Sequence, residues 1–225
     1  MNIELSTLKS IFNIGIKFGW ALFNPVKGIT KLRIPQKERL SFSEEEIATL
    51  LKTVKNDILM HNVILFGLYT GCRMNELLNL QWKDIDLSEK IILIRNKEDF
   101  NTKTGKSRMI PLCDTLRRVI NKMIIENGKI ITLHEPESYI FCKRDNKRYS
   151  KSTISHYFKC YLRKAKLPEK FHFHCLRHTF ITNCIKRGMN INYVQALAGH
   201  SELKTTLGYT HIGIEDLKMA ILAID

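Results

Sequence analysis

The sequence predicts an α+β domain that is mainly α-helical and carries a small antiparallel β-sheet or hairpin. Most of the 225 residues fall into segments whose apolar side chains recur every three or four positions, which is typical of helices. Two short apolar runs, at residues 91–95 and 108–112, have instead the length and composition of paired strands. The hydrophobic content of 44% is sufficient for one packed core.

The first predicted helix covers residues 1–20, where Leu5, Leu8, Phe12, Ile16 and Trp20 follow one another at spacings of three and four. Pro25 ends it, because the residue before a proline is pushed out of the helical region. Residues 24–40 are basic and lack clear periodicity, so we expect a linker there.

The next two predicted helices adjoin each other. Ser43 and Glu46 have the spacing of a capping box, which favours a helix over residues 44–54. Residues 57–69 are strongly apolar and indicate a buried helix that Gly71 stops. We expect a new helix to begin near Arg73.

After these helices comes the predicted strand pair, with Gly105 as the turn residue near the hairpin tip. Asp114 has the side chain of an N-cap for a helix over residues 114–126. Four further helices are predicted, over residues 151–164, 174–187, 191–198 and 214–222.

The charge of the chain favours a polyanionic partner. The formal net charge is +14 and the isoelectric point is near 9.6. Neutralising phosphates releases condensed counterions, so nucleic acid is the first candidate partner, ahead of a membrane surface or no partner at all. No apolar run approaches the ~20 residues that span a bilayer. The six cysteines form no Cys-x-x-Cys pair, which favours reduced thiols in a cytoplasmic protein.

The most informative segments lie in the C-terminal half. Residues 173–180 read Phe-His-Cys-Leu-Arg-His-Thr-Phe, residues 197–200 read Leu-Ala-Gly-His, and Tyr209 follows. An upstream block at residues 69–80 and a basic loop at residues 101–106 supply further cations. A tyrosine nucleophile, cations that hold a phosphate and imidazoles that handle protons are the groups needed to attack a phosphodiester.

In this order the chain resembles the tyrosine recombinases, the phage-type integrase family, from about residue 41 to the C-terminus. The residues that carry the likeness are Arg73, Lys103, His174, Arg177, His200 and Tyr209. The resemblance implies that residues 41–225 form a catalytic domain and residues 24–40 a linker. It also implies that residues 1–23 are only the last helix of a truncated core-binding domain.

Tyr209 is the expected nucleophile, because residues 205–211 resemble the nucleophile segment of that family, whereas the other tyrosines are expected to pack or lie at the surface. A free tyrosine has a pKa near 10, so it needs a proton acceptor or nearby positive charge. Arg73 and Arg177 are expected to clamp the phosphate, since a guanidinium forks two donors onto adjacent oxygens. Glu76, on the same helical face as Arg73, is expected to orient it.

Lys103 is the expected general acid, with Lys106 as the alternative. Either lysine could instead belong to a basic loop that only contacts the DNA backbone. His174 and His200 are expected to donate to the phosphate and handle protons. By contrast, the sequence favours structural or surface roles for His172 and His178, and simple packing for His211. His172, His174, Cys175 and His178 crowd together, but no second cluster of ligands has matching spacing, so we expect neither a metal nor another cofactor.

The resemblance implies a site-specific DNA recombinase, a tyrosine-type strand transferase that forms a 3′-phosphotyrosine intermediate. Its partner would be double-stranded DNA, with a homotetramer on paired recombination sites and a monomer in isolation, as in an integrase of a mobile genetic element. A type IB topoisomerase-like activity and a truncated, non-catalytic DNA-binding module are the alternatives. The apolar helix expected beyond Gly213 would pack on its own core or dock in a neighbouring subunit.

Overall fold

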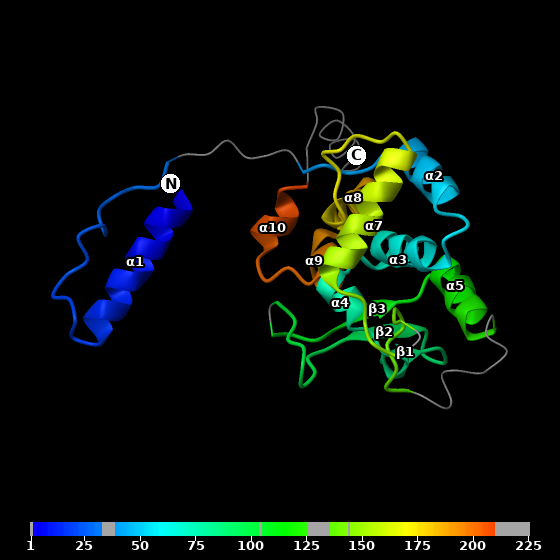
Figure 1. The fold of residues 1–225 in the computed structure, drawn as a ribbon, viewed down its shortest axis with the longest axis horizontal. Helices are drawn as coiled ribbons and strands as arrows, with labels where there is room; N and C mark the ends of the chain where they lie inside the picture. The colour runs from blue at the N-terminus through cyan, green and yellow to red at the C-terminus, as the bar shows by residue number, and fades with distance from the viewer. Residues whose placement is uncertain (1, 33–38, 104, 126–135, 144, 210–225) are drawn as a thin grey trace, which may run out of the picture. The chain divides into compact units, whose positions relative to one another are not determined.

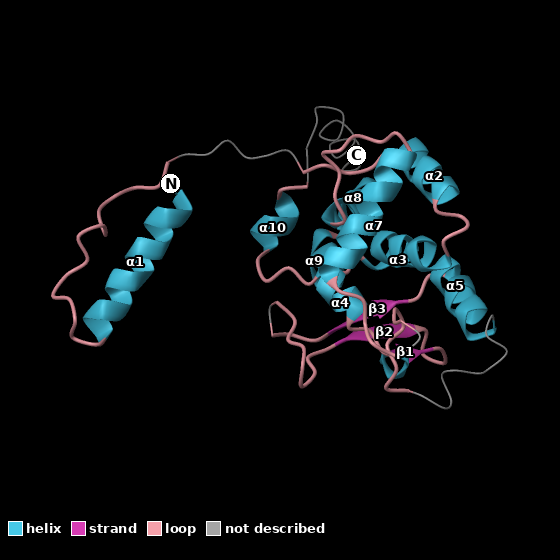
Figure 2. Ribbon diagram, viewed as in Figure 1, coloured by secondary structure: helices cyan, strands magenta, loops and turns pink. Residues whose placement is uncertain are grey.

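The computed structural model describes residues 2–32, 39–103, 105–125, 136–143 and 145–209. The chain divides into two compact units, Met1–Glu38 and Arg39–Asp225. The second unit is mainly helical and contains a three-stranded antiparallel sheet (Figures 1 and 2). The predicted fold class is therefore confirmed. None of the helices in the described ranges has the length and apolar content that a bilayer crossing requires.

The first unit consists of helix α1 (Asn2–Lys17) and a segment that returns along it. The helix is shorter than the predicted residues 1–20, because Gly19 adopts a left-handed conformation with φ of 73° and turns the chain. The Asn24 side-chain amide donates to the carbonyl of Lys9, and the Lys9 ammonium donates to two carbonyls of the returning segment. No residue of α1 is buried within this unit.

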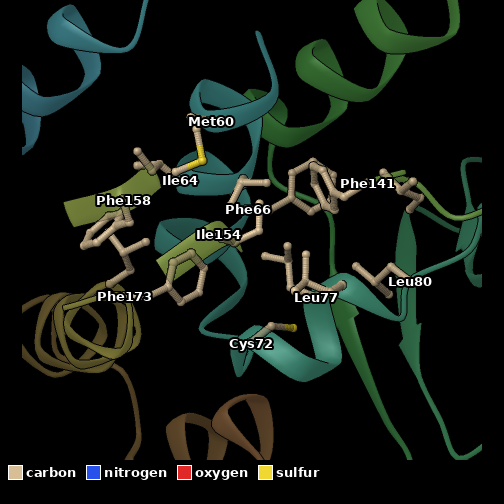
Figure 3. Close-up of a cluster of buried hydrophobic side chains, with 14 of the residues drawn as sticks. Met60, Ile64, Phe66, Cys72, Leu77, Leu80, Phe141, Ile154, Phe158 and Phe173 are labelled. Atoms are coloured by element: carbon tan, nitrogen blue, oxygen red, sulfur yellow. The ribbon is translucent and has the colours of Figure 1, made fainter. Parts of the chain in front are cut away.

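Helix α3 (Ile58–Thr70) is the centre of the second unit, and eight of its residues are buried. This agrees with the prediction of a buried helix from its unbroken apolar run. Figure 3 shows Met60, Ile64 and Phe66 of α3 among buried side chains from other elements. The surrounding helices are α2 (Glu44–Thr53), α4 (Met74–Leu78), α5 (Asp114–Ile125), α7 (Lys151–Lys164) and α8 (His174–Lys186).

The helix starts confirm part of the sequence pattern. Ser43 and Glu46 form both hydrogen bonds of the predicted capping box at the start of α2. Asp114, in contrast, is the first residue of α5 and not its cap, so that prediction was displaced by one position.

Gly71 ends α3 in a left-handed conformation with φ of 61°, and the ring of Phe180 on α8 lies against it. A Cβ at this position would lie 2.3 Å from Cδ1 of Phe180. We therefore expect Gly71→Ala to lower the free energy of unfolding, measured by urea denaturation, by at least about 2 kcal/mol, since the left-handed backbone alone costs about 1–2 kcal/mol.

Gly188→Ala is the matched control, because Gly188 has φ of 73° but no atom within 4 Å of an added Cβ. Equal losses in the two variants would show that the Phe180 contact adds nothing.

The sheet has the strand order β1-β2-β3, with β1 at Ile85–Asp86, β2 at Ile91–Ile94 and β3 at Arg108–Pro111. The predicted pairing of β2 with β3 is confirmed, and Ile92 lies opposite Ile110 with both side chains buried. Strand β1 and the preceding 3-10 turn, η1 (Trp82–Asp84), have too few residues to show a period and were not predicted.

Two short helices close the described part of the chain, α9 (Ile191–Ala198) and α10 (Leu203–Leu207). Helices α8 and α9 and the segment that follows α10 form a second apolar cluster, which contains Ile181, Cys184, Val194, Ala198 and Tyr209. The predicted nucleophile is thus held by packing. The predicted helix over residues 214–222 lies outside the described residues.

Candidate active site

An open hollow of about 630 Å³ lies in the second unit, and all six predicted site residues line it. The side chains around it include five cations and a single carboxylate. The hollow is therefore electropositive and suits an anion. Its lining comprises Arg39, Arg73, Asn75, Glu76, Phe100, Asn101, Lys103, Lys151, His174, Arg177, His178, His200, Thr205 and Tyr209.

Arg73 stands at the N-cap of α4 and is oriented by Glu76 one turn later. Its Nη1 donates to Glu76 Oε1 at 2.8 Å, and its Nη2 donates to the Gly199 carbonyl at 3.2 Å. Arg108 of β3 donates to both oxygens of the same carboxylate, at 3.2 and 2.7 Å. Glu76 therefore ties two arginines together, in line with the orienting role that the sequence suggested.

Burial alone would raise the pKa of Glu76, but hydrogen bonds and positive charge from Arg108 and Arg73 lower it to about 2. The unfolded carboxyl titrates near 4.5. This group therefore stabilises the fold fully above pH 4.5, and the contribution is lost as the pH falls from 4.5 to about 2.

We accordingly expect Glu76→Gln to flatten the acid limb of the stability curve. At about 1.4 kcal/mol per pKa unit, up to about 3 kcal/mol of pH-dependent stability should disappear. Urea denaturation between pH 2 and 7 measures it. Glu169→Gln, at an exposed carboxylate paired with Arg163, is the control that should keep the wild-type slope. An unchanged slope in Glu76→Gln would contradict the ion-pair account.

Arg177 of α8 is almost fully buried, with 2% of its surface exposed. Its Nη1 donates to the Gly71 carbonyl at 2.7 Å, whereas its Nη2 has no hydrogen-bond partner among the described residues. Burial and the nearby Arg73 lower the pKa of Arg177 to about 10, so the guanidinium stays charged at neutral pH. A buried charge with an open donor is costly unless an anion arrives.

The histidines of the hollow are held uncharged. Burial, followed by the charges of neighbouring arginines, lowers the pKa of His174 to about 4 and of His200 to about 3. Thr206 Oγ1 lies 2.9 Å from His200 Nδ1 and fixes that ring. Both rings are therefore neutral hydrogen-bonding groups at physiological pH.

Tyr209 is 8% exposed, and burial raises the pKa of its hydroxyl while Arg39 and Arg177 oppose the rise. Its hydroxyl is hydrogen-bonded to Nδ1 of His178. The His200 ring stacks on the tyrosine ring with centroids 6.3 Å apart. The Tyr209 side chain is thus a positioned phenol in its protonated form, and a phenol acts as a nucleophile only after it loses its proton.

Sequence reasoning missed two residues that contact Tyr209. His178 had been assigned a structural or surface role, yet it lines the hollow beside the tyrosine hydroxyl. Its position four residues after His174 puts both histidines on one helical face, and that spacing could have found it. Arg39 has no sequence signal of this kind, since it follows a segment without periodicity.

Arg39 covers the face of the tyrosine ring, with the guanidinium carbon 4.3 Å from the centroid. Its Nη1 also donates to the Thr205 carbonyl at 2.7 Å. The arginine therefore binds both the ring and the backbone of the segment that carries Tyr209, and its charge favours the phenolate.

The two candidate lysines lie in different hollows. Lys103 lines the hollow that contains Tyr209, whereas Lys106 lines a neighbouring one with Arg108 and His200. Gly105 has φ of 67° and closes the turn that begins at Thr102, as predicted. Of the two candidate lysines, Lys103 is therefore the one that shares a hollow with Tyr209.

His172 and Cys175 contact each other, with 3.2 Å between Nδ1 and Sγ, and His172 does not line the hollow. Within the described ranges, no group of three or more His, Cys, Asp or Glu side chains is arranged to hold a metal ion.

The chain matches the phage integrase family over residues 41–215. It is 31% identical to the tyrosine recombinase XerA of Pyrococcus furiosus over 98% of this chain and 72% of that protein. It is 32% identical to a tyrosine recombinase of Pseudothermotoga lettingae over 93% of this chain and 69% of the relative.

Among solved structures, the integrase of transposon Tn1549 in complex with a circular intermediate DNA is similar. The TM-score is 0.79 at 20% identity, over 99% of this chain and 78% of that one. A crystal structure of XerA recombinase gives a TM-score of 0.66 at 25% identity, over 97% and 74% of the two chains.

The family match and the relatives named tyrosine recombinases define the chain as a DNA strand-transferring enzyme. The chain belongs to the phage integrase family, whose members are tyrosine recombinases. Its function is site-specific recombination, with DNA as the partner, and the topoisomerase-like and non-catalytic alternatives are not favoured.

Proposed function

We propose that this hollow cuts and rejoins DNA with Tyr209 as the nucleophile, through a 3′-phosphotyrosine intermediate. The observation that carries the proposal is the buried Arg177, whose open Nη2 donor lies in one hollow with Arg73 and Tyr209. A phosphodiester anion would supply the missing acceptor and offset the repulsion between the two arginines.

In the first step the Tyr209 oxygen forms a bond to the scissile phosphorus, and the bond from phosphorus to the 5′ oxygen breaks. Arg73 and Arg177 stabilise the charge on the non-bridging oxygens, which grows in the transition state. Neutral His174 and His200 donate further hydrogen bonds to these oxygens. Lys103 gives a proton to the departing 5′ oxygen, which would otherwise leave as an alkoxide.

In the second step a 5′ hydroxyl from the partner duplex attacks the phosphotyrosine. A phosphodiester is reformed and Tyr209 is released, so the bond energy is conserved and no nucleotide cofactor is consumed. We propose that the protein is a monomer in isolation and a homotetramer on paired sites, as an integrase of a mobile element. Residues 41–225 would be the catalytic domain of that assembly, and residues 1–23 part of a core-binding domain.

Capture on a suicide duplex tests the proposal. A nick close to the scissile phosphate lets the short 5′-hydroxyl fragment diffuse away after cleavage, so the covalent complex accumulates. A labelled DNA–protein adduct on a denaturing gel supports a phosphotyrosine enzyme, and tight DNA binding without adduct would favour the non-catalytic module. Joining of two different duplexes would separate recombination from a simple topoisomerase-like resealing.

A further inference from the structure

His178 has no part in the steps above, yet it contacts the atom that reacts. Its Nδ1 and the Tyr209 hydroxyl form a hydrogen bond between α8 and the segment that follows α10. The His178 ring also packs against His174, whose ring is nearly perpendicular to it with centroids 4.7 Å apart. His178 is therefore held by two contacts, one of them to the tyrosine hydroxyl.

The other imidazoles of the hollow are less well placed to accept this proton. His200 Nδ1 is engaged by Thr206, and its ring lies at only 17° to the tyrosine ring, which is a stacking arrangement. His174 packs against His178 in a T-shaped arrangement, and in the described part of the chain no hydrogen bond joins it to the hydroxyl. Among the described residues, His178 Nδ1 is the hydrogen-bond partner that the structure gives to the Tyr209 hydroxyl.

We propose that His178 is the general base for Tyr209, an inference that rests on the proposed function. As the tyrosine oxygen attacks phosphorus, its proton moves to Nδ1 of His178, and Nε2 carries the other ring proton of the imidazolium. When the phosphotyrosine bond breaks in the second step, the same proton returns to the tyrosine oxygen. Lys103 gives a proton to the 5′ oxygen, so the 5′ oxygen and the tyrosine oxygen each exchange a proton with a different side chain.

The charges that face His178 link this transfer to the substrate. Burial, together with the neighbouring His174, Arg39, His172 and Arg177, lowers the pKa of His178 to about 4. The imidazole is therefore neutral and ready to accept a proton, but an imidazolium beside the charged Arg39 and Arg177 is unfavourable. A bound phosphodiester brings the compensating negative charge, so Tyr209 becomes a nucleophile only when DNA is in place.

The test compares His178→Ala and His178→Asn with wild-type protein on the suicide duplex. Both should lower the rate of adduct formation by roughly 10²–10⁴-fold, the usual size of a general-base contribution, while DNA binding changes little. His178→Asn keeps a hydrogen-bond acceptor near the Nδ1 position but not its basicity, so it separates proton transfer from positioning. His156→Asn, at an exposed histidine of α7, is the control and should cleave normally.

Two chemical rescues identify which oxygen exchanges a proton with His178. A substrate with sulfur in place of the bridging 5′ oxygen has a leaving group that needs no proton, so it should restore Lys103→Ala but not His178→Ala. Fluorinated tyrosine at position 209 has a lower phenol pKa, so it should restore part of the activity of His178→Ala and shift its pH profile towards lower pH.

Failure of the His178 assignment and failure of the proposed function give different results. Wild-type rates for both His178 variants, or full rescue of His178→Ala by the sulfur substrate, would overturn the assignment and leave the proposed function intact. Absence of any adduct with wild-type protein would overturn the proposed function and this inference together.

Discussion

Tyr209→Phe should abolish the covalent adduct on the suicide duplex completely, since no other group replaces the missing oxygen nucleophile. The ring keeps its place in the apolar cluster of α8 and α9 and beneath Arg39, so DNA binding and folding should persist. Losing the hydrogen bond to His178 should cost only about 1 kcal/mol of stability. Denaturing gels measure the adduct, and thermal melts measure the fold.

Tyr193→Phe is the matched control for that variant. Tyr193 is on α9 and 68% exposed, so the loss of its hydroxyl should leave the adduct unchanged. An adduct that persists in Tyr209→Phe and disappears in Tyr193→Phe would move the nucleophile to α9.

Arg177→Met should separate catalysis from stability. Methionine fills part of the same volume without charge, so the unpartnered Nη2 and the repulsion by Arg73 both disappear. We expect the unliganded protein to unfold with an equal or larger free energy, because replacing an uncompensated buried charge is often neutral or stabilising. Cleavage should fall by roughly 10²–10³ or more, the cost of losing a strong oxyanion donor.

Arg177→Lys should recover little of this cleavage, because an ammonium cannot reach two oxygens with the fixed fork of a guanidinium. Arg163→Met, at an exposed arginine of α7, should change neither the cleavage rate nor the stability much. Near-normal cleavage by Arg177→Met would remove Arg177 from the phosphate clamp.

Local sequence signals were sufficient to predict most of the helices and strands. Helices α7 and α9 have the predicted bounds because each combines helical periodicity with an N-cap whose side chain accepts from the first turn, Ser150 and Asn190. In contrast, β1 and α10 have two and five residues, which is too short for a period to emerge. The formation of both elements depends on contacts with other segments of the folded chain.

For the candidate site, the sequence predicted which residues gather but not all of their contacts. The cations and the tyrosine were predicted because their sequence setting is distinctive, and the structure brings them to one hollow. Which histidine meets the tyrosine hydroxyl depends on how α8 packs against the chain after α10, and no local pattern records that. The Arg39 contact with Thr205 joins residues 166 positions apart, which likewise only the folded chain defines.

The layout of the hollow also bears on synthesis of the protein in the cell. Arg73 reaches the Gly199 carbonyl across 126 positions of sequence, and Tyr209 follows still later in the chain. A ribosome makes Arg73 long before the tyrosine and Arg177 shortly before it, and domains fold as units once their parts are available. Under the proposed function, a nascent chain that lacks the segment around Tyr209 lacks the nucleophile, so cleavage of DNA requires a chain synthesised past that residue.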